Sequence, residues 1–167
     1  GATAVLDARH VAVEQQNLGK LAHLGQKISN TVHEMQKERG MSAVFINTKG
    51  KGYQAEIPGQ RMATDTAAQN MFDAFKKLDP TFYGTGFVAT YMAAKNSMAG
   101  LTAMRSKVSG LSATVPQMAS YYTPTITKLL ANVEIMTRLS QNAKISNGIS
   151  AYPAFLQAKE RAGVERA

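Results

Sequence analysis

Four arginines lie at helical-repeat positions where a protein core normally has apolar side chains. Arg39 follows Met35 by four residues. Arg105 follows Leu101 by four residues and precedes Val108 by three. A guanidinium is costly to bury without a partner, and its planar set of donors suits a planar oxyanion held by two hydrogen bonds. The spacing therefore predicts a small-anion site formed by arginines turned into a helical bundle, namely Arg39, Arg61, Arg105 and Arg166.

Two other interpretations account for the same arginines. Each could lie at the edge of an apolar stripe and extend its charged end to water, or pair with a carboxylate inside the protein. Asp65 lies one helical turn after Arg61, so we expect it to neutralise Arg61 and rank this arginine behind the other three. We expect the carboxylates to be too few to neutralise all four arginines, which leaves a cavity that favours an anion. The remaining candidates for internal pairing are Glu38, Glu160 and Glu165.

The sequence gives no support for catalysis, metal binding or a cofactor. His10, His23 and His33 do not have metal-ligand spacing among themselves. The motifs of serine hydrolases, zinc proteases, P-loops and dinucleotide-binding folds do not occur. The chain contains no cysteine, which excludes disulfides and thiolate metal sites. We expect a binding protein without a metal or cofactor, and not an enzyme.

One long helix carries the first of the four arginines. Apolar residues repeat at spacings of three and four from about Ala4 to Thr48, without a proline. At 1.5 Å per residue, this segment predicts a helix of roughly 65 Å, longer than a compact domain requires. Ser42 continues the stripe of Arg39 and is included in the predicted site. The inward stripes comprise Leu18, Leu21, Leu24, Ile28, Thr31, Val32, Met35, Glu38, Phe45 and Ile46.

Glycine and proline divide the rest of the chain into shorter helical segments. No alternating strand pattern occurs, so we predict an all-α, up-and-down helical bundle with a long N-terminal helix, as a single domain over residues 1–167. The expected order is a loop over 47–59, a second helix over about 60–78, a third over about 87–114 with Arg105, a fourth after Pro116, and a last helix after Asn147-Gly148 with Arg166.

The composition is that of an ordinary globular protein, with 44% hydrophobic and 18% charged residues. The formal net charge of +8 favours anionic partners, including nucleic acid and acidic lipid as well as a small anion. The basic residues are scattered along the chain and form no recognisable nucleic-acid motif. We therefore expect this domain to bind no nucleic acid. No window approaches the roughly 18 apolar residues of a membrane span.

Residues 32–43 read Val-His-Glu-Met-Gln-Lys-Glu-Arg-Gly-Met-Ser-Ala. This stretch resembles the opening of the NIT domain, the nitrate- and nitrite-sensing module of bacterial receptors. That motif is in outline Leu-Gln-(Lys/Arg)-Glu-Arg-Gly-x-Ser, and only its leading Leu is replaced here, by Met35. The order and spacing of family motifs match from about residue 18 to the end. The further matching stretches are Gln60-Arg61-x-x-Thr64-Asp65, residues 121–130 and residues 156–167.

The resemblance implies an all-α bundle in which nitrate or nitrite is held by arginines from several helices. The arginine of Lys-Glu-Arg-Gly is Arg39, and that of Gly-x-Glu-Arg-Ala is Arg166. Arg105, in an Arg-x-x-Val stretch, is a weaker match, and Arg61 belongs to a further family motif.

The resemblance also implies a biological setting. We expect the periplasmic sensor domain of an inner-membrane receptor, such as a chemoreceptor (methyl-accepting chemotaxis protein) or a sensor kinase. Transmembrane helices would flank the domain, and a homodimer is the expected assembly. Two alternatives stay open: a cytoplasmic module fused to an RNA-binding antitermination domain, and a sensor of another small anion such as a carboxylate.

Overall fold

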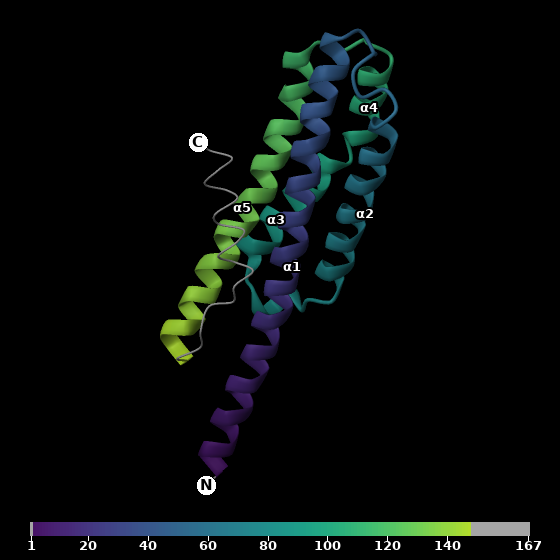
Figure 1. Cartoon of the computed structure of the whole chain (residues 1–167). Helices are drawn as coiled ribbons and strands as arrows, with labels where there is room; N and C mark the ends of the chain where they lie inside the picture. The colour runs from purple at the N-terminus through teal and green to yellow at the C-terminus, as the bar shows by residue number, and fades with distance from the viewer. Residues whose placement is uncertain (1, 148–167) are drawn as a thin grey trace.

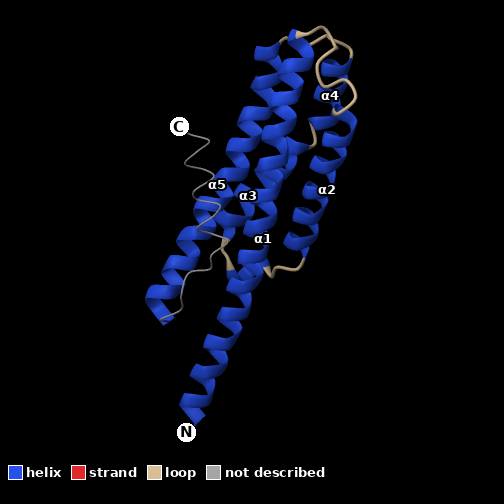
Figure 2. Cartoon of the chain, viewed as in Figure 1, coloured by secondary structure: helices blue, strands red, loops and turns tan. Residues whose placement is uncertain are grey.

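The computed structural model describes residues 2–147, and these residues form a bundle of α-helices with no strand among them (Figure 1, Figure 2). The predicted all-α bundle is thereby confirmed. The predicted last helix, with Arg166, lies outside the described residues. The elements are α1 (Ala2–Asn47), α2 (Ile57–Lys76), the short 3-10 helix η1 (Pro80–Phe82), α3 (Thr85–Met98), α4 (Leu101–Ser109) and α5 (Val115–Asn147).

The long N-terminal helix α1 is the axis of the bundle, with α2 and α5 packed against it. Its first part projects past the other helices, and most of its side chains there are exposed (Figure 1). From Leu18 to Met35 the predicted inward stripe is buried, whereas Phe45 and Ile46 at its end are only partly buried. The same face carries Glu38 and Ser42 without exposed surface. The burial follows the three-and-four spacing of the sequence. α1 therefore contributes both apolar core and polar groups to the interior.

On the other side of the core, α3 and α5 pack against each other with large apolar and aromatic side chains. Phe75 of α2 stacks on Tyr91 of α3, with ring centroids 3.7 Å apart and planes inclined by 7°. Tyr122, Ile126 and Leu129 of α5 are almost completely buried. This packing fixes the orientation of α5, and with it the side chains that α5 presents to α1.

The predicted third helix over residues 87–114 is wrong in its length and continuity. It is divided into α3 and α4 at Ala99 and Gly100, whose N–H groups bond back only three residues. The hydroxyl of Tyr121 in α5 donates to the Ser97 carbonyl at 2.8 Å, and a Cβ at Gly100 would lie 3.1 Å from the Tyr121 ring. The close packing of Tyr121 against Ser97 and Gly100 thus favours the break between α3 and α4. The break places Arg105 on a short separate helix.

Two prolines, Pro58 and Pro116, lie at helix beginnings, whereas Pro124 lies inside α5. Pro116 lies in the first turn of α5, where a missing N–H removes no helical hydrogen bond. Pro58 has the same position in α2, which begins at Ile57, three residues before the expected start. Both prolines therefore set the direction in which a helix leaves its loop.

The beginning of α1 and the end of α5 lie at the same pole of the bundle (Figure 1). The α1–α2 loop and the α4–α5 connection lie at the opposite pole. No helix within residues 2–147 is both long and apolar enough to cross a membrane.

Candidate anion site

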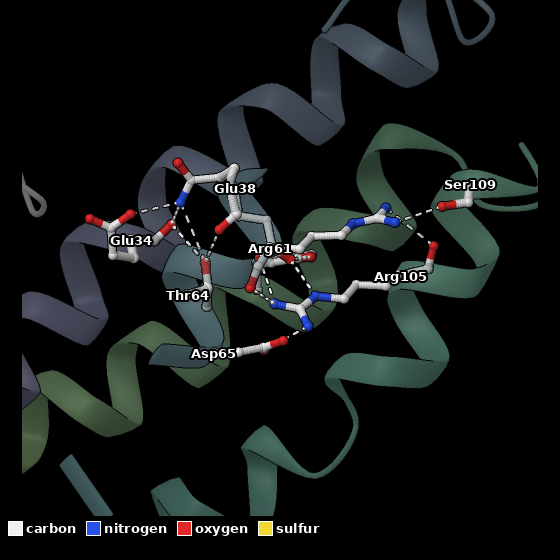
Figure 3. Close-up of polar contacts among 9 residues, drawn as sticks. Glu34, Glu38, Arg61, Thr64, Asp65, Arg105 and Ser109 are labelled. Carbon is white, nitrogen blue, oxygen red and sulfur yellow. Dashed lines mark hydrogen bonds and ion pairs between the residues drawn. The ribbon is translucent and has the colours of Figure 1, made fainter. Parts of the chain in front are cut away.

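Arg105 of α4 is held by two carboxylates from two other helices (Figure 3). Its Nε and Nη2 donate to the two oxygens of Glu38 in α1 at 3.0 and 2.8 Å. Its Nη1 donates to Asp65 of α2 at 2.7 Å. The Arg105 side chain is 13% exposed and that of Glu38 is not exposed at all. For Arg105, the structure therefore shows the internal ion pair rather than an empty cavity.

Glu38 is the common acceptor of this polar centre. Tyr122 of α5 also donates to it, so one carboxylate connects α1 with both α4 and α5. Burial acts to raise the pKa of Glu38, but hydrogen bonds from Arg105 and Tyr122 and the Arg105 charge outweigh it, and the pKa lies below its usual value. Burial and the Glu38 charge raise the pKa of Tyr122, which keeps its proton for this bond. Glu38 is thus ionised in the interior.

Arg61 of α2 and Arg105 of α4 are bonded to each other's backbone. Arg61 Nη2 donates to the Arg105 carbonyl at 3.3 Å, and Arg105 Nη2 donates to the Arg61 carbonyl at 3.2 Å. Arg61 Nη1 also donates to the Ser109 hydroxyl at 2.7 Å. The expectation that Asp65 pairs with Arg61 is wrong, because this carboxylate reaches across to Arg105.

The charges of this cluster are balanced. Arg61 and Arg105 are positive, and Glu38 and Asp65 are negative. The expectation of too few carboxylates therefore fails for Arg105, which pairs with both, whereas Arg61 bonds to the Ser109 hydroxyl and the Arg105 carbonyl. The bonds connect α4 to α1 and α2, so the cluster stabilises the packing of α4, the shortest of the described α-helices.

Arg39 lies in a different environment, although it follows Glu38 directly. Successive residues are rotated by about 100° around a helix, so its side chain leaves α1 on another side. Arg39 is half-buried, and its Nη1 donates to the Thr123 hydroxyl of α5 at 3.2 Å. The structure thus brings Arg61 and Arg105 together and places Arg39 where α1 meets α5.

Ser42 lies one turn beyond Glu38 and is fully buried. Its hydroxyl meets hydrogen-bond geometry with no described group, although it lies near the Tyr122 hydroxyl and acts to lower the pKa of Tyr122. A buried hydroxyl without a partner is uncommon and marks a place where a further polar group would be stabilised.

Sequence reasoning missed how the polar centre is organised. The sequence placed Glu38 on the inward stripe and among the candidate carboxylates, but it did not identify Arg105 and Tyr122 as the partners of Glu38. The available signal was an acidic residue at an inward heptad position, since such a residue needs a cationic partner. Gln60 was also missed; its amide donates to the backbone carbonyl and the side chain of Glu34, at 3.0 and 2.8 Å. Among the described residues there is no group of three side chains that could hold a metal ion.

Comparison with known proteins adds two findings. The model of the NIT family, described as nitrate and nitrite sensing, matches residues 30–167. The solved structure of the NasR transcription antiterminator is similar, with a TM-score of 0.71 and 20% sequence identity. The similarity covers 83% of this chain but only 38% of that chain. No curated protein matches.

Proposed function

This chain belongs to the NIT family of nitrate- and nitrite-sensing domains, and we propose that it binds nitrate or nitrite through arginines from several of its helices. The observation that carries the proposal is the position of Arg39. Its guanidinium reaches from α1 to Thr123 of α5, so an oxyanion bound there would contact both long helices. A guanidinium carries its donors in a planar arrangement that suits the oxygens of a planar anion.

The other arginines have different parts in this proposal. Arg166 is included on its sequence motif alone, since it lies outside the described residues. Arg105 can contact an anion only at the edge that Asp65 now occupies, because Glu38 holds the other edge. Arg61 supports Arg105 through its backbone carbonyl, and the unpartnered hydroxyl of Ser42 is available as a further donor.

Binding would act by changing the relative position of helices. An anion shifts a conformational equilibrium only by its difference in affinity between two arrangements. A hundredfold difference corresponds to about 2.7 kcal/mol. α1 and α5 reach the same pole of the bundle, so a displacement of one along the other is delivered there (Figure 1).

We place this sensor in a bacterial receptor, such as a chemoreceptor or sensor kinase, as a periplasmic domain working as a homodimer. The length of α1, whose first part projects past the other helices, supports this, since receptor stalks use helices of that length (Figure 1). We assign it no catalytic activity, because its family is defined by sensing.

The alternative is a cytoplasmic sensor within an antiterminator. It is favoured by the structural similarity to NasR, of which this chain spans little more than a third. Reading the full-length gene separates the two settings, because membrane-spanning segments on both sides support the receptor and an RNA-binding domain supports the antiterminator.

Thermal unfolding tests the ligand and the principal residue together. We expect nitrate or nitrite, but not chloride, sulfate, phosphate or acetate at equal ionic strength, to raise the melting temperature. At one hundred times Kd the stabilisation is about 2.7 kcal/mol, a shift of several degrees. Arg39→Ala should abolish the shift, whereas Arg138→Ala, which removes an exposed arginine from α5, should keep it.

The remaining outcomes decide against parts of the proposal. A shift with acetate alone would replace the ligand by a carboxylate. No shift with any anion would leave the arginines with a structural role only. Binding of DNA or RNA with steep salt dependence would support a nucleic-acid function instead.

A further inference from the structure

The two edges of the Arg105 guanidinium have unequal partners. The inner edge, Nε and Nη2, is bound by Glu38, whose side chain has no exposed surface. The outer edge, Nη1, is bound by Asp65, whose side chain is 60% exposed. Figure 3 shows Asp65 reaching Arg105 from α2, apart from Glu38. Only Asp65 can move into water while the mostly buried Arg105 keeps a carboxylate partner, namely Glu38.

A groove of about 420 Å³ leads to this outer edge, between α2 and the α3–α4 turn. Arg105 and Asp65 line this groove, and so do Thr102 and Lys95. Lys95 Nζ is held 5.5 Å from the centre of the Phe72 ring, so a second cation faces the same groove. The groove is therefore lined by two positive side chains and by one carboxylate that would compete with an entering anion.

We propose that Asp65 is an internal competitor that occupies an anion site on Arg105. An oxyanion entering the groove takes the place of the Asp65 carboxylate at Nη1, and Asp65 turns into solvent. Glu38 stays bound to the inner edge, so the interior loses no charge partner. This inference rests on the proposed function and extends it, because Asp65 would lower the affinity of Arg105 for an anion.

The displacement has a structural consequence. Asp65 belongs to α2 and Arg105 to α4, so their ion pair connects two helices. When an anion replaces Asp65, this connection is removed, while the backbone bonds between Arg61 and Arg105 remain. Anion binding in the groove would therefore weaken the contact between α2 and α4.

The test is calorimetric titration of nitrate and, separately, acetate into matched variants at fixed ionic strength. Asp65→Asn should bind one or both anions about fivefold more tightly than the wild type, because the competing carboxylate is gone. Asp73→Asn is the control. It makes the same charge change on the same helix, but Asp73 is bonded to Gln69 and does not line the groove. Its affinity should equal that of the wild type.

Two further substitutions test which side chains cause the tighter anion binding. In the Asp65→Asn background, Lys95→Gln should reduce the added affinity, and because Lys95 is exposed the protein remains folded. Arg105→Lys should remove it, since a single ammonium cannot replace the guanidinium edge.

The outcomes separate this inference from the proposed function. Equal gains in Asp65→Asn and Asp73→Asn would reflect net charge alone and overturn it. Affinities for nitrate and acetate that are both unchanged by Asp65→Asn would overturn it and leave the Arg39 proposal intact. A gain for acetate, with no nitrate or nitrite binding to any variant, would support the competitor and overturn the proposed ligand.

Discussion

Glu38 and Arg39 are neighbours in the chain, yet they belong to two regions with opposite character. Glu38 lies in a closed centre, where Arg105 and Tyr122 satisfy its charge. Arg39 lies at the junction of α1 and α5 and reaches a neutral hydroxyl on Thr123. One turn of α1 thus supplies both a fixed structural centre and the arginine that we propose for ligand binding.

The difference follows from what burial demands. A fully buried carboxylate must have a cationic or donor partner inside the protein, and that partner then gives rigidity. The guanidinium of Arg39 is only half-buried, and its direction is set by contact with the neighbouring helix α5. Substitutions in the closed centre should therefore change stability, whereas substitutions at Arg39 should mainly change binding.

Removing the central carboxylate should have the largest effect on stability. Glu38→Ala leaves Arg105 mostly buried with Asp65 as its only carboxylate, and we expect a loss of about 3–5 kcal/mol in unfolding free energy. Urea denaturation followed by circular dichroism measures it. Asp73→Asn, an exposed change on α2, should stay within about 0.5 kcal/mol of the wild type. A loss below about 1 kcal/mol for Glu38→Ala would show that the centre is not a major source of stability.

Two buried tyrosines allow a finer comparison. Tyr122→Phe deletes a hydrogen bond to an ionised carboxylate and should cost about 1.5–3 kcal/mol. Tyr91 is equally buried, but its hydroxyl has no hydrogen-bond partner among the described residues. Tyr91→Phe should therefore change stability by less than about 0.5 kcal/mol, or increase it. The same denaturation series measures both, and equal losses would mean that the Glu38 bond adds nothing specific.

The helices were largely predictable from the sequence, because burial in α1 and α2 follows local periodicity. The break between α3 and α4 was not, because it depends on Tyr121 of α5 approaching Gly100. That contact lies more than 20 residues away along the chain, and no helical repeat encodes it.

The site was predictable in its residue types but not in its pairing. Inward spacing correctly indicated that Arg105 needs an anionic partner. Helical spacing assigned Asp65 to Arg61, one turn away, whereas the carboxylate pairs across helices with Arg105. Sequence distance ranks partners on one helix only, and the choice between helices depends on how they pack.

The smallest expected effect is the loss, at acid pH, of the contribution that Glu38 makes to the unfolding free energy. This loss distinguishes Glu38 from the other carboxylates. The folded-state pKa of Glu38 is lowered from its usual value of 4.5, so its ionised form is favoured by folding. Its contribution is present above pH 4.5 and is lost as the pH falls through the lowered value. The pKa values of Glu34 and Asp79 are also lowered, so the pH dependence of the wild type alone does not isolate the contribution of Glu38.

The difference between wild type and Glu38→Gln isolates it, because the other carboxylates are common to both proteins. Urea unfolding at a series of pH values from 7 to about 3 should show a constant difference above pH 4.5 that shrinks at lower pH. Asp73→Asn should run parallel to the wild type from pH 7 down to 4.5. A Glu38→Gln difference that stays constant down to pH 3 would mean that Glu38 is not held ionised by folding. The hydrogen bonds from Arg105 and Tyr122 to Glu38 would then have to be weaker than their geometry indicates. Glu38 would differ from Arg39 in its position in the bundle rather than in how folding holds its charge.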